Sequence, residues 1–118
     1  MIRDFRDIKV WQKSHNLTLQ IYKITKQFPK EEIYSLTSQM RRAASSVTAN
    51  IVEGFSRRSQ KDQLHFYNIS DASLAELRYH VLLSFDLGYI DKEHFQNLQS
   101  VINEVGKMLN GWIQSQKS

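Results

Sequence analysis

The amino-acid sequence predicts an all-α fold, a left-handed, up-down-up-down antiparallel four-helix bundle. Apolar residues recur in steps of three and four through four segments, which places them on one face of each helix. No interruption between these residues is long enough to hold a strand. The expected connections are only a few residues long, and short connections make consecutive helices antiparallel neighbours.

The first and last helices carry the clearest stripes. We expect the first helix over about 8–27, capped by Asp7 and ended by Pro29, because residues before proline avoid the α region. We expect the last helix over about 92–114, capped by Asp91. Their stripes are Val10, Ser14, Leu17, Ile21, Ile24 and Phe28 in the first helix, and Phe95, Leu98, Ile102, Val105, Leu109 and Trp112 in the last.

The second helix is expected over about 31–57, with a break near Tyr34–Ser35, where Ser35 is a second candidate cap. Its middle is rich in small residues, which allow a neighbouring helix to approach closely. The core stripe expected here consists of Ile33, Leu36, Met40, Ala43, Val47, Ile51 and Gly54.

The third helix is expected over about 60–87, with Ser59 as its cap and Gly88 after its end. It carries two apolar stripes, and a helix that is apolar on two faces is usually covered on two sides. The alternatives are one wide core-facing stripe or a second face covered by another copy of the chain. The expected core stripe is Phe66, Ser70, Ser73, Leu77, Val81 and Phe85, and the second, here called the outer stripe, is Ile69, Ala72, Tyr79, Leu83 and Leu87.

Length and composition narrow the class of protein. The 118 residues predict one domain, 1–118, and a hydrophobic content of 41% suffices for a core. The absence of cysteine excludes disulfides and thiolate metal sites. We see neither a secretory signal nor a membrane span, so the expected location is the cytoplasm.

The usual catalytic motifs are missing. A di-iron bundle needs Glu-x-x-His pairs, and no glutamate in the chain is followed by histidine at that spacing. The four glycines are scattered, so no phosphate-binding loop exists, and Gly54-Phe55-Ser56 lacks the second glycine of a nucleophile elbow. We therefore expect no metal, no cofactor and no enzymatic activity.

Polar residues close to the apolar seam form a second group of candidates. Buried carboxylates are costly unless they are paired, so we interpret these residues as a structural network in which glutamates pair with arginine or cap backbone groups. The alternative is a functional pocket around Glu53 and Glu76. The network consists of Arg41, Arg42, Asn50, Glu53, Ser73 and Glu76.

Basic residues are the third group. The formal net charge is +4, and the excess of lysine and arginine lies in the first half of the chain. In an up-down bundle the start of the first helix, the second connection and the C-terminus meet at one end, which attracts phosphate backbones. We call this end the basic pole; its candidate nucleic-acid-binding residues are Arg3, Arg6, Lys9, Arg57, Arg58 and Lys61, with Lys117 nearby.

Several blocks together resemble one protein family over essentially the whole chain. They are Gln39–Val47 and Ala49–Gly54, together with Asp7–Trp11, Phe28–Pro29 and Leu87–Ile90. This pattern is similar to the four-helix bundle proteins encoded in intervening sequences of bacterial 23S rRNA genes. One departure is Ala72 before Ser73, where the family usually has glycine.

The resemblance implies a homo-oligomer, specifically a pentameric ring, and a relationship to the accessory proteins of diversity-generating retroelements. Those are basic pentamers that bind nucleic acid and a reverse transcriptase. We therefore expect a non-enzymatic homo-oligomer that binds nucleic acid, RNA foremost, through the basic pole. The alternative function is a scaffold that recruits another protein, and the third is an enzyme with a pocket around Glu53 and Glu76.

Overall fold

The computed structural model describes residues 1–117, and within that range the chain is helical with no strand. The four α-helices are α1 (Lys9–Thr25), α2 (Leu36–Ser56), α3 (Gln60–Asp86) and α4 (Lys92–Gln116). Two 3-10 helices precede α1 and α2, namely η1 (Phe5–Asp7) and η2 (Lys30–Glu32). The predicted all-α class and four-helix architecture are confirmed, whereas the left-handed twist stays a prediction.

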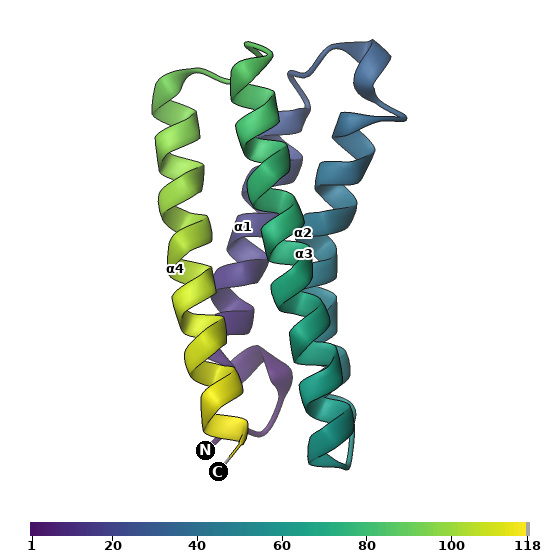
Figure 1. Cartoon of the computed structure of the whole chain (residues 1–118), viewed down its shortest axis with the longest axis vertical. Coiled ribbons are helices and arrows are strands. Elements are labelled where there is room, and N and C mark those ends of the chain that lie inside the picture. Colours follow the sequence, from purple (N-terminus) through teal and green to yellow (C-terminus); the bar gives the residue numbers. More distant parts are fainter. Residues whose placement is uncertain (118) are drawn as a thin grey trace.

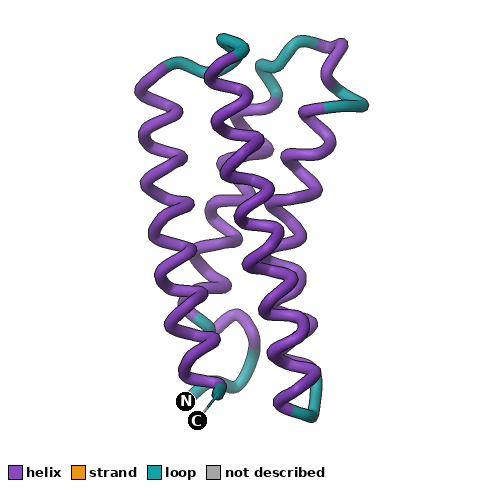
Figure 2. The backbone as a smooth tube through the Cα atoms, viewed as in Figure 1, coloured by secondary structure: helices purple, strands orange, loops and turns teal. Residues whose placement is uncertain are grey.

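Each helix packs against two neighbours: α1 and α3 both contact α2 and α4. Figure 1 shows the turns between consecutive helices at alternate ends, with both termini at the same end as the α2–α3 turn. The molecule measures 44 × 25 × 20 Å. Figure 2 shows that loop segments are confined to the two ends of the bundle, so these ends form separate surfaces.

All four helices contribute to a continuous apolar core. The seams of α1 and α4 follow the predicted stripes closely, because their heptad spacing keeps one face inward along the whole helix. The largest fully buried side chains from these two helices and α2 are Leu17, Ile21, Met40, Ile51, Ile102 and Leu109.

Helices α2 and α3 pack most closely, because small residues line their contact. The Ser70 hydroxyl donates a 2.7 Å hydrogen bond to the carbonyl of Val47. Near the end of α2, the fully buried ring of Tyr67 lies against Gly54. A Cβ on Gly54 would fall 2.4 Å from Cε1 of Tyr67, so this contact exists only because residue 54 is glycine.

The prediction that Asp7 caps the first helix is wrong. Ile8 is the N-cap of α1 and provides no side-chain hydrogen bond. Asp7 instead closes the preceding turn, where its Oδ2 accepts the backbone N–H of Arg3 at 2.9 Å. Asp4 and Asp7 form a capping box around η1, because two carboxylates three residues apart can each accept a backbone N–H of that turn.

The break predicted near Tyr34–Ser35 is present, and it shortens the second helix to Leu36–Ser56. Ser35 occupies the N-cap position without a side-chain cap bond. Ile33, which the stripe placed in the core, is 51% exposed, because it lies before the break and the heptad phase does not continue through it.

The predicted core stripe of the third helix is partly wrong. Ser70, Leu77 and Val81 are buried as expected, but the other buried positions are Tyr67, Leu74, His80 and Ser84. The predicted members Phe66, Ser73 and Phe85 are only half-buried. Since α3 contacts both α2 and α4, its inward face is wide and several phases fit its sequence.

The remaining helix ends agree with their sequence signals. The hydroxyl of Ser59 accepts the N–H of Asp62 at 3.1 Å, and Asp91 accepts the N–H of His94 at 2.8 Å. Gly88 has a φ of 81°, the left-handed conformation that glycine adopts without steric cost after a helix.

Replacing Gly54 tests the α2–α3 contact. The Gly54→Ala methyl would displace the Tyr67 ring, and overpacking of this kind costs about 1–3 kcal/mol, more than the ~1 kcal/mol that alanine gains over glycine in a helix. We expect a lower free energy of unfolding in urea denaturation. Gly111→Ala is the matched control, because nothing lies within 4 Å of its added Cβ, and it should stabilise the chain. Equal effects of the two changes would contradict the role of Gly54.

Candidate nucleic-acid interface

The six residues predicted for the basic pole lie in three segments that meet at the end of the bundle bearing the termini. Arg3 and Arg6 flank the start of η1, Lys9 opens α1, Arg57 and Arg58 form the α2–α3 turn, and Lys61 lies in the first turn of α3. Helix η1 contacts both α1 and α2, and Figure 1 shows these segments at the same end. All six side chains are exposed.

Two of the six cations are already paired. Arg6 forms a 3.0 Å salt bridge with Asp4. Arg57 forms one with Glu53 at 3.0 Å, and its guanidinium lies 4.5 Å from the centroid of the Phe66 ring. Among the described residues, the other four cations of the pole form no ion pair; they are Arg3, Lys9, Arg58 and Lys61.

Hydrogen bonds fix the backbone of the α2–α3 turn. The side-chain amide of Gln63 donates to the carbonyl of Arg57 at 2.9 Å. The amide of Gln60 donates to the carbonyl of Gln116 at the end of α4, at 2.5 Å. These contacts hold the turn that carries Arg58 against the rest of the pole, so part of its cationic surface is preorganised.

A groove of about 550 Å³ opens at the same end, between the N-terminal segment and the last turns of α4. Lys9 and Asp7 lie on one wall, and Met108, Gly111 and Trp112 on the other. Sequence reasoning missed this groove, because it assigned Trp112 only to the core seam of the last helix. Trp112 is in fact half-buried, and Ile113 is the buried side chain of that last turn.

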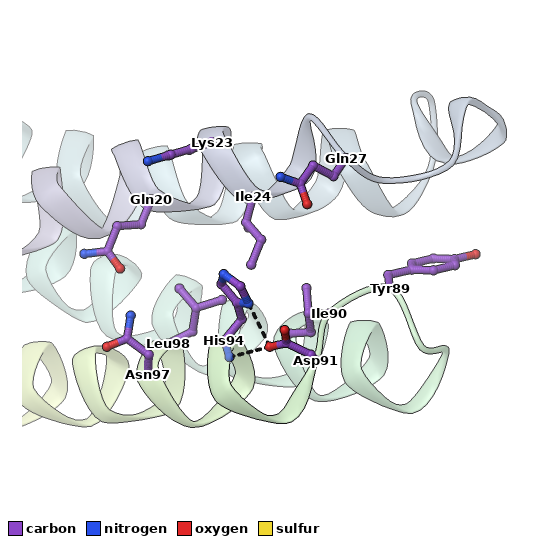
Figure 3. Close-up of a pocket in the computed structure, with 10 residues that line it drawn as sticks. All are labelled: Gln20, Lys23, Ile24, Gln27, Tyr89, Ile90, Asp91, His94, Asn97 and Leu98. Carbon is purple, nitrogen blue, oxygen red and sulfur yellow. Dashed lines mark hydrogen bonds and ion pairs between the residues drawn. The ribbon is translucent and has the colours of Figure 1, made fainter.

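The opposite end of the bundle carries a smaller groove of about 300 Å³ between α1 and α4. Figure 3 shows Lys23 and Gln20 on the α1 side of this groove, and Asp91 and His94 on the α4 side. Asp91 accepts hydrogen bonds from both the backbone N–H and the ring Nδ1 of His94, at 2.8 and 2.7 Å. The lining of this groove carries one lysine, Lys23, and one carboxylate, Asp91, whereas six exposed lysines and arginines gather at the basic pole, so the basic pole is the better site for a polyanion.

The polar residues predicted as one network form separate clusters along α2 and α3. Glu53 and Glu76 lie at the surface rather than inside the bundle, with side chains 51% and 39% exposed. Glu76 bonds Arg42 at 3.2 Å, just as Glu53 bonds Arg57. Because each carboxylate has an arginine partner, the arrangement differs from an open acidic pocket.

The other network residues make local contacts. The hydroxyls of Ser73 and Ser46 share a 2.8 Å hydrogen bond. The Asn50 side-chain amide also donates to the Ser46 hydroxyl. Arg41 faces the other neighbour of α2, donating to the hydroxyl of Thr25 at 2.9 Å. Thus the Ser46–Ser73 hydrogen bond joins α2 to α3, the Asn50 amide bonds within α2, and Arg41 joins α2 to α1.

His80 lies beside the Arg42–Glu76 pair and is 6% exposed. Its Nε2 is 3.8 Å from the Glu76 carboxylate, and its Nδ1 has no hydrogen-bond partner among the described residues. Burial lowers the pKa of His80. The Glu76 carboxylate opposes this shift, and Arg42 adds a smaller effect that lowers the pKa further.

Within the described residues, no group of His, Asp and Glu side chains is arranged to hold a metal ion. None of the helices in that part of the chain is both long and apolar enough to cross a membrane.

Comparison with known proteins identifies relatives of this fold. The sequence model of the 23S rRNA-intervening sequence protein family matches residues 6–111. A crystal structure from Bacteroides thetaiotaomicron, of a protein with unknown function from the S23 ribosomal protein family, is similar with a TM-score of 0.82 and 25% sequence identity. That similarity covers 89% of this chain and 95% of the other. No curated protein matches the chain.

The buried His80 predicts a pH dependence of stability. Its pKa in the folded chain lies below the ordinary value of 6.5, so below that pH the unfolded chain binds more protons and stability falls as pH decreases. We expect the urea midpoint to fall between pH 7.5 and about 5.5, where carboxylates stay ionised. His80→Gln should flatten this dependence, whereas His65→Gln, at an exposed position, should keep it. A slope that survives His80→Gln would refute the assignment.

Proposed function

The chain belongs to the 23S rRNA-intervening sequence protein family, and we propose that it is a non-enzymatic homo-oligomer that binds nucleic acid through its basic pole. RNA associated with 23S rRNA intervening sequences is the leading target. The observation that carries the proposal is the set of four exposed cations without an ion pair among the described residues, Arg3, Lys9, Arg58 and Lys61, at one end of the bundle.

Electrostatics supports binding at this end. Unpaired surface cations release condensed counterions when they contact phosphates, which provides affinity without base recognition. Arg58 lies on the α2–α3 turn that Gln60 and Gln63 anchor, and Lys61 follows in the first turn of α3. Contacts of this type position a backbone and read little sequence, so we expect weak sequence preference.

Self-association would multiply the charge of the pole. On the outer stripe of α3, Tyr79 is 58% and Leu87 is 49% exposed, and the neighbouring Leu82 is 44% exposed. A groove of about 300 Å³ between α3 and α4 adjoins this surface, lined by Tyr79, Leu82 and Phe95 among others. We propose that another copy of the chain covers this face in a ring, for which the pentamer is the leading size.

The contacts of Glu53 and Glu76 argue against catalysis by these two glutamates. The enzyme hypothesis places both carboxylates in one open cleft, free of arginine partners. Glu53 and Glu76 instead bond Arg57 and Arg42 at 3.0 and 3.2 Å. Their contacts favour a role in fixing helix surfaces.

A protein-binding scaffold is the second candidate function. Apolar side chains are also exposed away from α3, with Leu19 at 54% and Tyr22 at 42% on α1 and Tyr34 at 94% after η2. Such a surface would suit a partner protein. A complex with that partner that survives nuclease and high salt would favour this function over nucleic-acid binding.

Charge removal at the basic pole tests the main proposal. We expect Arg58→Ala/Lys61→Ala to weaken RNA binding and to reduce the slope of log K against log salt by about 2, one for each lost phosphate contact. Fluorescence anisotropy over a salt series measures both. Arg57→Ala should have a smaller effect, because Glu53 already pairs with Arg57.

Lys26→Ala/Lys30→Ala is the matched control, since it removes the same charge from exposed residues at the other end of the bundle. Binding that is absent at low salt, or equally reduced by both double variants, would refute the basic pole as the interface.

The oligomer is tested by placing charge on the outer stripe. Light scattering of the unaltered chain should give about five times the 13.9 kDa of one copy. Tyr79→Lys/Leu87→Lys should lower this mass, because it buries like charges in the contact, while circular dichroism stays helical. Asn16→Lys, at an exposed position of α1, which does not contact α3, should leave the mass unchanged. A monomer in the unaltered chain would contradict the ring.

A further inference from the structure

The groove beside the termini has walls of two kinds. Ile2, Met108 and Trp112 present apolar surface, and Gly111 contributes only backbone, with open space where a Cβ would lie. At about 550 Å³ it falls within the range of small-ligand sites, ~300–1,000 Å³. A planar apolar group therefore has both room and contact surface here.

Both signs of charge line this groove, and further cations lie next to its lining residues in the sequence. Lys9 lies on its wall, and Arg3 and Lys117 follow closely after the lining residues Ile2 and Ser115. Asp7 is the carboxylate of the wall, with its Oδ2 engaged by the backbone N–H groups of Arg3 and Asp4 at 2.9 and 3.2 Å.

The base and the phosphate of a nucleotide would be attracted to different parts of this surface. A phosphate in the groove would lie near the Asp7 carboxylate as well as Lys9, whereas on the rest of the basic pole it would meet exposed cations that have no ion pair among the described residues, namely Arg3, Arg58 and Lys61. A base is uncharged and gains by contact with aromatic and apolar side chains. The apolar and aromatic lining thus favours a base in the groove, with its phosphates on the neighbouring cations of the basic pole.

We propose that this groove receives one unpaired nucleobase of an RNA strand whose phosphates lie on the basic pole. The inference rests on the proposed function and narrows its substrate to single-stranded or locally unpaired RNA. In a duplex the bases are stacked and paired, so a duplex can use the cations but not the groove.

The test compares three labelled ligands at one salt concentration: a short oligouridylate, an abasic strand of equal length, and an RNA duplex. We expect oligouridylate to bind about fivefold or more tightly than the abasic strand, which is the gain from one base–aromatic contact. Gly111→Leu fills the groove with a better helix former than glycine, so the variant should fold. It should abolish the preference for bases and leave affinity for the abasic strand within about twofold.

Asn110→Leu is the control, an equally large change at an exposed neighbour that does not line the groove. Equal affinity of the unaltered chain for oligouridylate and the abasic strand would overturn the nucleobase site and leave the basic pole standing. Tighter binding of the duplex than of oligouridylate would also overturn the nucleobase site. A preference for bases that survives Gly111→Leu would overturn it as well. A change of oligomer mass in Gly111→Leu would assign the groove to a contact between copies and overturn it too. Failure of all three ligands to bind would overturn the nucleobase site together with the proposed function.

Discussion

The close approach of α2 to α3 is the constraint on which the rest of the structure depends. Gly54 leaves space for the Tyr67 ring, and Ser70 bonds the backbone of α2 directly. These contacts set the distance between two helices whose turn carries Arg57 and Arg58. The packing of uncharged small residues in the core therefore determines where the cations of the basic pole are held.

The fold was largely predictable because heptad spacing reports directly on which helix face is buried. The prediction from heptad spacing succeeded on α1 and α4, where a single narrow apolar stripe leaves no doubt about which face is buried. The prediction failed in part on α3, where Phe66 and Tyr67 are both aromatic and Tyr67 is the one whose ring packs against Gly54. The prediction that Asp7 caps α1 failed for a similar reason, because Asp4 lies three residues upstream and the two carboxylates form the capping box of η1 instead.

The position of the basic pole followed from helix order, but the state of its side chains did not. Sequence treated Arg57 and Arg58 as equivalent, whereas Glu53 and the Phe66 ring engage only Arg57. It also placed Glu53 and Glu76 inside the bundle, although both side chains lie at the surface. Ion pairs depend on side-chain reach across helix faces, which a one-dimensional pattern does not encode.

The groove walls bring residues from both ends of the described chain together, since Ile2 and Ser115 line the same space. Any tag or fused domain attached at either end would emerge over the cationic surface and shield it. Joining the two ends through a short peptide and reopening the chain between η2 and α2 would instead leave that surface clear. Such a circular permutant would carry its label at the far side of the bundle.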